Sequence, residues 1–155
     1  MENSYYYTYD TPFGSIVIES DGSSITGIKR QGSAEPVGKK EANTLTDVTA
    51  MQLEEYFAGK RRRFDVPLNP CGTDFQCSVW KALQEIPYGK TKSYKQIAQA
   101  IGNPKACRAV GLANNKNPIW IIIPCHRVIG ADGALTGYGG GLTMKQRLLE
   151  LERRK

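Results

Sequence analysis

The residues with the clearest chemical potential are Cys125 and His126, which are adjacent in the C-terminal third of the chain. His126 is the only histidine in the sequence, and imidazole is the side chain that titrates near neutral pH. A thiol beside such a group is a candidate activated nucleophile. A single cysteine is also often a small buried hydrophobe, so the pair alone leaves both interpretations open.

The segment before this pair must position it. Ile119–Ile123 is a run of five apolar, mostly β-branched residues, which predicts a short buried strand. Pro124 has no N–H to donate, so strand pairing should end there and release the thiol. We therefore expect Cys125 at the end of a buried strand.

The cysteines do not have the spacing of a metal site. Cys71, Cys77, Cys107 and Cys125 form no Cys-x-x-Cys pair, and one histidine cannot complete the usual ligand sets of zinc. A zinc-deaminase half-site is excluded because Val128 stands where its second cysteine would be. We expect no metal and no cofactor.

The composition is that of a soluble globular protein with enough apolar residues for a sizeable core. The sequence has no run long enough for a transmembrane helix and no N-terminal signal segment. Four scattered cysteines without a signal segment favour a reducing compartment, where Cys125 would stay a free thiol. We expect a cytoplasmic protein, associated with the nucleoid if the source is prokaryotic.

Charge is unevenly distributed along the chain. Residues 1–71 carry 8 Lys and Arg against 10 Asp and Glu, whereas residues 72–155 carry 13 against 5. The difference favours a polyanionic partner for the C-terminal part, although an ordinary basic surface would give the same counts.

The N-terminal part predicts an α/β domain of structural role over residues 1–71. Turn residues separate three segments rich in Tyr, Ile, Val and Thr, which predicts antiparallel strands. A helix with apolar spacing should follow a polar loop, and the basic run at 60–63 is interpreted as a connection to a further strand. The expected ranges are strands at 5–10, 15–19, 24–29 and 64–66, a loop at 31–42 and a helix at 45–57.

The C-terminal part, 72–155, predicts mostly helices. Thr73 with Gln76 and Ser93 with Gln96 are capping boxes that should open two helices, the first ended by Pro87 and the second near Gly102. Asn103–Pro104 predicts an N-cap and first position of a third helix, over residues 104–112. The last two helices would form a helix-turn-helix unit, for which DNA binding and a structural helical hairpin both remain open.

Taken together, these residues resemble those of the O6-alkylguanine-DNA alkyltransferases, also called methylated-DNA–protein-cysteine methyltransferases. Ile123–Ile129 matches the family's active-site signature throughout. The match extends over residues 72–152, whereas residues 1–71 are only loosely similar. The matching segments are Tyr88-Gly89, Ser93-Tyr94, Gly102–Pro104, Arg108–Gly111, Asn117-Pro118, Gly137-Tyr138, Gly140–Leu142, Lys145 and Leu148-Leu149.

The resemblance implies a fold and a reaction. The fold would be mixed α/β, with a small N-terminal antiparallel sheet plus helix of ribonuclease H-like type and a mostly helical C-terminal domain of winged-helix type. The reaction would be a single, stoichiometric transfer of an alkyl group to Cys125 from O6 of guanine, or O4 of thymine, in a nucleotide flipped out of duplex DNA. The partner would be double-stranded DNA carrying O6-alkylguanine, bound by a monomer.

The resemblance also implies roles for individual residues. A water would relay a proton from Cys125 to His126, and Glu152 would orient the imidazole. Helical periodicity independently places Glu152 beside Leu148 on the buried face of the last helix, with Glu150 pointing away. Further catalytic roles would fall to Tyr94, Asn117 and Lys145. Arg127 is expected in a structural ion pair.

DNA and substrate contacts are carried over in the same way. Arg108 would be a finger that fills the gap left by the extruded nucleotide. The remaining DNA-binding residues would be Ser93, Tyr94, Lys105, Ala106, Cys107, Gly111 and Asn115. The substrate pocket would be lined by Tyr94, Cys125, Val128, Tyr138, Gly139 and Trp120, although Trp120 fits a core position at least as well.

Two other functions remain open alternatives. A non-catalytic protein that binds alkylated lesions would not need Cys125. A helix-turn-helix regulator would bind undamaged DNA in a sequence-specific way.

Overall fold

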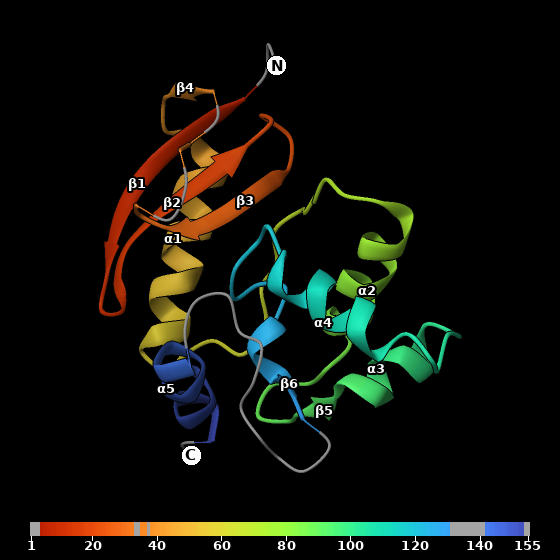
Figure 1. The fold of residues 1–155 in the computed structure, drawn as a ribbon. Coiled ribbons are helices and arrows are strands. Elements are labelled where there is room, and N and C mark those ends of the chain that lie inside the picture. The colour runs from red at the N-terminus through yellow and green to blue at the C-terminus, as the bar shows by residue number, and fades with distance from the viewer. Residues whose placement is uncertain (1–3, 33–34, 37, 131–141, 154–155) are drawn as a thin grey trace. The chain divides into compact units, whose positions relative to one another are not determined.

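The computed structural model describes residues 4–32, 35–36, 38–130 and 142–153 (Figure 1). The chain forms two compact units, Met1–Cys71 and Gly72–Lys155. Within the described ranges, no helix is long and apolar enough to cross a membrane.

The first unit is a four-stranded sheet with one helix. Its strands are ordered β3-β2-β1-β4, with antiparallel pairing except for the parallel edge pair of β1 and β4. The three long strands confirm the sequence prediction within one residue at each end. The short β4 lies in the segment predicted to be a loop. The elements are β1 (Tyr5–Thr11), β2 (Gly14–Ser20), β3 (Ile25–Arg30), β4 (Lys39–Lys40) and α1 (Thr44–Phe57).

Helix α1 packs on the sheet and closes the core of this unit. Asn43 caps it through a reciprocal capping box with Thr46. Ile16 and Ile18, which alternate along β2, are fully buried together with Leu53 and Tyr56 of α1, as expected for a sheet with one covered face. The predicted strand at 64–66 is wrong. In this region an isolated bridge joins Leu68 to Ile25, the first residue of β3. The Ile25 N–H bonds the Pro67 carbonyl and the Asn69 N–H bonds the Ile25 carbonyl, so the chain pairs with the edge of the sheet at one residue only there.

The second unit is mostly helical. Trp80 of its first helix donates an indole hydrogen bond of 2.8 Å to the Ala113 carbonyl, which ties two helices together across the core. A two-stranded parallel pair, β5 and β6, lies beside the helices. The elements are α2 (Asp74–Gln84), β5 (Lys92–Ser93), α3 (Tyr94–Ala100), α4 (Cys107–Asn115), the 3₁₀ turn η1 (Cys125–Arg127), β6 (Val128–Ile129) and α5 (Leu142–Arg153).

Both predicted capping boxes are present, at Thr73 and Ser93, and they open α2 and α3. The predicted start of the next helix is wrong. The Asn103 N–H bonds the Ala98 carbonyl and the Gly102 N–H bonds the Gln99 carbonyl, a C-terminal cap that Gly102 adopts at φ +77°. Asn103 therefore ends α3 rather than capping α4, which begins at Cys107 without a side-chain cap and runs to Asn115.

The predicted strand at 119–123 is also wrong, although all five residues are buried as expected. The chain turns back on itself there, and an isolated bridge joins Trp120 and Ile123. The Ile122 N–H bonds the Trp120 carbonyl and the Ile123 N–H bonds the Ile119 carbonyl, so part of the backbone hydrogen bonding of this segment is made within it. A buried apolar run can fold as a compact turn when its own backbone groups pair with one another.

Candidate active site

Two tight turns present Cys125. Ile121 has φ +72°, and the Ile122 N–H bonds the Trp120 carbonyl across it at 2.9 Å, which is the hydrogen bond of a γ-turn. Pro124 then adopts φ −82° and ψ 67°, and the Cys125 N–H bonds the Ile123 carbonyl across it at 2.8 Å. This is an inverse γ-turn, which runs directly into η1. The two turns thus fix the backbone that leads into Cys125, and the positive φ of Ile121 makes the first of them a point of local strain.

Two asparagines hold these turns. Asn117 donates from Nδ2 to the Ile123 carbonyl at 2.7 Å and accepts at Oδ1 from the Ile119 N–H at 3.0 Å, so it braces the segment between α4 and η1. Asn114 is buried and donates from Nδ2 to the Cys125 carbonyl at 3.4 Å. Asn114 is not among the site residues predicted from the sequence, although its place on the buried face of α4 could have indicated it.

Glu152 is the hub of the buried polar network. Its carboxylate lies 2.6 Å from His126 Nε2, accepts from Arg127 Nε at 2.8 Å and Nη2 at 3.0 Å, and accepts from the Gly89 N–H at 3.2 Å. Arg127 also donates to the Ile86 carbonyl at 2.7 Å and lies over the Tyr88 ring. The predicted orientation of α5 is confirmed, because Glu152 is buried and Glu150 is exposed.

The predicted ion pair of Arg127 is confirmed as well. Its consequence is that a cation balances Glu152 inside the protein, where an unpaired carboxylate would be costly. The sequence did not indicate that Glu152 is the partner of Arg127 in this ion pair, since the two residues are 25 positions apart.

These contacts set the protonation of the pair. Burial alone would raise the pKa of Glu152, but the hydrogen bonds and charges of His126 and Arg127 outweigh it and lower the pKa to about 2. Burial lowers the pKa of His126, assisted by the charges of Arg127 and Lys145, against the opposing effect of Glu152. At neutral pH the network therefore holds a carboxylate and a neutral imidazole.

The network also fixes the tautomer of His126. An ionised carboxylate can only accept, so Nε2 carries the proton and donates to Glu152. Nδ1 is then the unprotonated, basic nitrogen. It is buried and has no hydrogen-bond partner within the described part of the chain. The imidazole thus has an unprotonated nitrogen that is not engaged by Glu152, as a general base requires.

Lys145 is a positively charged group that interacts with the Cys125 thiol. Its side chain is fully buried, its ammonium donates to the Val128 carbonyl, and it lies 6.0 Å from the centre of the Tyr94 ring. Burial lowers the pKa of Lys145 to about 8, while its interaction with Cys125 acts in the opposite direction. That interaction is reciprocal, so the ammonium favours the thiolate form of Cys125.

Comparisons with known proteins identify the family of this chain. Family models described as "6-O-methylguanine DNA methyltransferase, ribonuclease-like domain" and "6-O-methylguanine DNA methyltransferase, DNA binding domain" match residues 4–70 and 74–154. The chain belongs to the 6-O-methylguanine DNA methyltransferase family.

Relatives in this family match almost end to end. A methylated-DNA–protein-cysteine methyltransferase of Methanosarcina acetivorans is 51% identical over 152 residues, which cover 96% of this chain and 97% of the relative. The protein of the same name from Mycobacterium tuberculosis is 51% identical over 155 residues, covering 96% and 92%. The crystal structure of M. tuberculosis OGT in complex with DNA superposes with a TM-score of 0.91 at 50% identity, covering 96% of this chain and 92% of that one.

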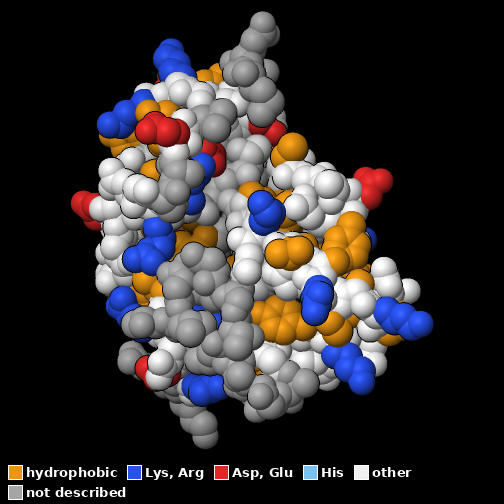
Figure 2. Space-filling view, viewed as in Figure 1, with side chains coloured by type: hydrophobic (Ala, Val, Ile, Leu, Met, Phe, Trp, Pro, Cys, Tyr) orange, Lys and Arg blue, Asp and Glu red, His pale blue; other side chains and the backbone are white. Residues whose placement is uncertain are grey.

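Six of the residues predicted to contact DNA lie on α4 or directly before it, and the other two, Ser93 and Tyr94, lie at the start of α3. Lys105, Cys107, Arg108 and Asn115 are exposed, and Ala106 and Gly111 are half-buried. Ser93 is used as the cap of α3, and a Cβ on Gly111 would lie 3.9 Å from the Tyr94 ring. Figure 2 shows Lys and Arg side chains among apolar ones over the part of the surface where α3 and α4 lie.

The remaining predicted pocket residues divide into two groups. Val128 and Trp120 are buried in the same segment as Cys125, and Trp120 lies in the turn rather than on a strand. Tyr138 and Gly139 lie outside the described residues.

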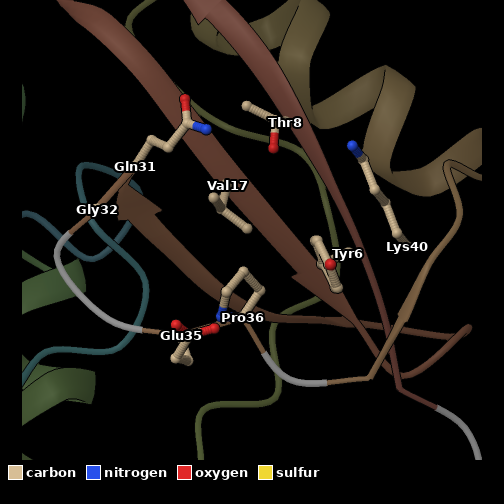
Figure 3. Close-up of a pocket in the computed structure, with 8 residues that line it drawn as sticks. All are labelled: Tyr6, Thr8, Val17, Gln31, Gly32, Glu35, Pro36 and Lys40. Carbon is tan, nitrogen blue, oxygen red and sulfur yellow. The ribbon is translucent and has the colours of Figure 1, made fainter.

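One open pocket of about 550 Å³ lies in the first unit (Figure 3). Tyr6, Thr8 and Val17 form its floor on the sheet, and Glu35 and Lys40 stand at its edge. None of the predicted site residues lines it. Across the described ranges, no three His, Cys, Asp or Glu side chains lie close enough to hold a metal ion.

Proposed function

We propose that this protein repairs DNA by transferring an alkyl group from O6 of guanine, and from O4 of thymine, to Cys125 in a single turnover. The observation that carries the proposal is the buried series Cys125, His126 and Glu152 in a chain of this family. It supplies a thiol, a neutral base with its lone pair directed away from its carboxylate, and a carboxylate held ionised.

The chemical step follows from these groups. The Cys125 proton passes to His126 Nδ1 through a solvent molecule, and Glu152 stabilises the imidazolium that forms. The thiolate attacks the alkyl carbon, so a carbon–sulfur bond forms while the bond from carbon to O6 breaks. The electron pair of that bond stays on guanine, where a hydrogen bond from the Tyr94 hydroxyl stabilises the developing negative charge. The proton taken up by His126 then returns through solvent to the guanine and restores the neutral base. Since the thioether does not revert, each protein molecule acts once.

The substrate must leave the helix to reach the sulfur. Cys125 is buried, and O6 of a stacked guanine cannot meet a buried thiol. In this proposal Arg108, which is exposed on α4, enters the duplex and occupies the space of the extruded nucleotide. The cationic surface of the second unit supplies the sequence-independent affinity for phosphates.

The proposal is tested by reaction with a duplex containing one O6-methylguanine. The expected result is one restored guanine per protein molecule, with no further turnover when more duplex is added. Cys125→Ser should restore none. Repeated turnover, or repair by the serine variant, would overturn the proposal.

We also propose that the protein acts as a monomer in the cytoplasm. Its four cysteines are free thiols, and Cys71 and Cys107 are exposed, which suits a reducing compartment. Light scattering at micromolar concentration should give the mass of one chain. Cell fractionation should recover the protein with the soluble fraction and the DNA.

A further inference from the structure

Leu112 presents an apolar side chain on the exposed face of α4, in the family's DNA-binding domain. Its side chain is 65% exposed, the largest exposed fraction among the large apolar side chains of the described residues. It lies on α4, whose only charged residue is Arg108. A single exposed leucine needs no partner of its own, so what matters here is where Leu112 lies relative to Arg108 on a helix of the family's DNA-binding domain.

The helical positions place Leu112 within the exposed face of α4. At about 100° per residue, Leu112 lies about 40° to one side of Arg108, and Asn115 lies about 20° to the other side. The buried residues Val110, Ala113 and Asn114 occupy the opposite half of the helix. Arg108 and Leu112 are also one turn apart, so their side chains are neighbours.

Tyr94 lies on the other side of this face. Gly111, which is next to the Tyr94 ring, is about 60° from Arg108 in the direction opposite to Leu112. Arg108 therefore separates Leu112 from the side where Tyr94 lies. With the extruded nucleotide on the Tyr94 side of Arg108, Leu112 faces the other DNA strand, which is the strand opposite the alkylated nucleotide.

We propose that Leu112 is a second DNA-contacting residue of α4, which packs its apolar side chain in the minor groove against the strand opposite the alkylated nucleotide. This proposal rests on the proposed function. Proteins that bind the minor groove use leucine and similar side chains as apolar wedges beside their arginines, and this stabilises an opened base step. Arg108 fills the gap, while Leu112 holds the facing strand in the opened geometry.

The test compares Leu112→Ala with the wild type on three substrates: an O6-methylguanine duplex, the same oligonucleotide as a single strand, and free O6-benzylguanine. The repair rate in the duplex should fall about tenfold, which corresponds to 1.4 kcal/mol. Rates on the single strand and the free base should change less than twofold, because neither has an opposite strand. Leu112→Met should retain the rate in the duplex.

Two controls separate this contact from other effects. Met51→Ala removes an exposed apolar side chain (51% exposed) from α1 of the other unit and should change nothing. Lys105→Ala should reduce the salt slope of duplex binding by about one, whereas Leu112→Ala should leave that slope unchanged, since it removes no phosphate contact.

The result is decisive in both directions. Equal loss on all three substrates, or a rate in the duplex within twofold of wild type, would overturn the role of Leu112. Failure of the wild type to repair the duplex would instead refute the proposed function.

Discussion

The chemistry of this protein depends on how three buried side chains share charge. Glu152 is ionised because two cationic or donating neighbours surround it, and it in turn fixes which nitrogen of His126 holds the proton. Lys145 adds a positive charge that interacts with the thiol of Cys125. None of these groups would act in this way in water, so burial is a condition of reactivity.

Replacing Glu152 should change both the free energy of unfolding and the rate of alkyl transfer, and the two effects can be measured separately. Glu152→Gln leaves Arg127 buried without its anion, so the free energy of unfolding should fall by about 3 kcal/mol. It also removes the charge that stabilises an imidazolium, so transfer to Cys125 should slow at least tenfold. Urea titration and single-turnover kinetics measure the two effects. Glu150→Gln, on the exposed side of α5, should leave both unchanged.

Acid should weaken the fold through the same residues. The pKa of Glu152 is about 2 in the folded protein against 4.5 in the unfolded chain, so its stabilisation is complete above pH 4.5 and is lost as pH falls towards 2. The pKa of His126 is also lowered by folding, so its contribution is complete above 6.5 and declines below it. The free energy of unfolding should therefore begin to fall below pH 6.5. A flat profile between pH 6.5 and 3 would contradict this.

At the scale of elements, the turn before Cys125 carries the site. Ile121 adopts a backbone conformation that β-branched residues avoid, and such strain costs about 1–3 kcal/mol. The surrounding hydrogen bonds of Asn117 and the buried neighbours of the turn hold it in place.

The strain is measurable by comparing two glycine substitutions. Ile121 and Ile123 are both buried, so each change removes a similar apolar side chain. Only Ile121→Gly relieves a positive φ, so it should reduce the free energy of unfolding by about 1–2 kcal/mol less than Ile123→Gly. Equal losses by chemical denaturation would mean that Ile121 is not strained.

This turn also shows where sequence reasoning succeeds and where it fails. Capping boxes and the periodicity of α5 are local signals, so the starts of α2 and α3 and the inward direction of Glu152 were predictable. The turn at 119–123 was not, because a short apolar run has the same pattern whether it extends or folds back. Asn103 misled for a related reason, since it ends one helix with its backbone instead of beginning the next with its side chain.

Contacts between distant residues were the least accessible. Arg127 with Glu152 and Asn114 with the Cys125 carbonyl depend on how α2, α4 and α5 pack, which no local spacing encodes. The family resemblance supplied Glu152 and Lys145, whereas the pairing of Arg127 with Ile86 and Gly89 with Glu152 came only from the structure.

At the scale of the whole molecule, the excess of positive charge lies in one part of the chain. The excess of Lys and Arg lies in residues 72–155, where the family's DNA-binding domain matches, and residues 1–71 are slightly acidic. The location of charge, rather than the net value of +6, should therefore control binding.

Two charge reversals test this directly. Lys105→Glu and Lys60→Glu change the net charge equally, and both lysines are exposed. Lys105→Glu should weaken duplex binding at least fivefold at low salt and flatten its salt dependence. Lys60→Glu should change affinity less than twofold in the same titration. Equal weakening would mean that the net charge alone controls binding.

The central claim is that one sulfur atom, that of Cys125, receives the alkyl group. The most direct measurement is peptide mapping by mass spectrometry after reaction with an O6-methylguanine duplex, because the protein contains four cysteines that must be distinguished. We expect the mass of one methyl group on the peptide that contains Cys125 and on no other. A methyl group on the peptide of Cys71, Cys77 or Cys107, or no mass increase at all, would contradict the account.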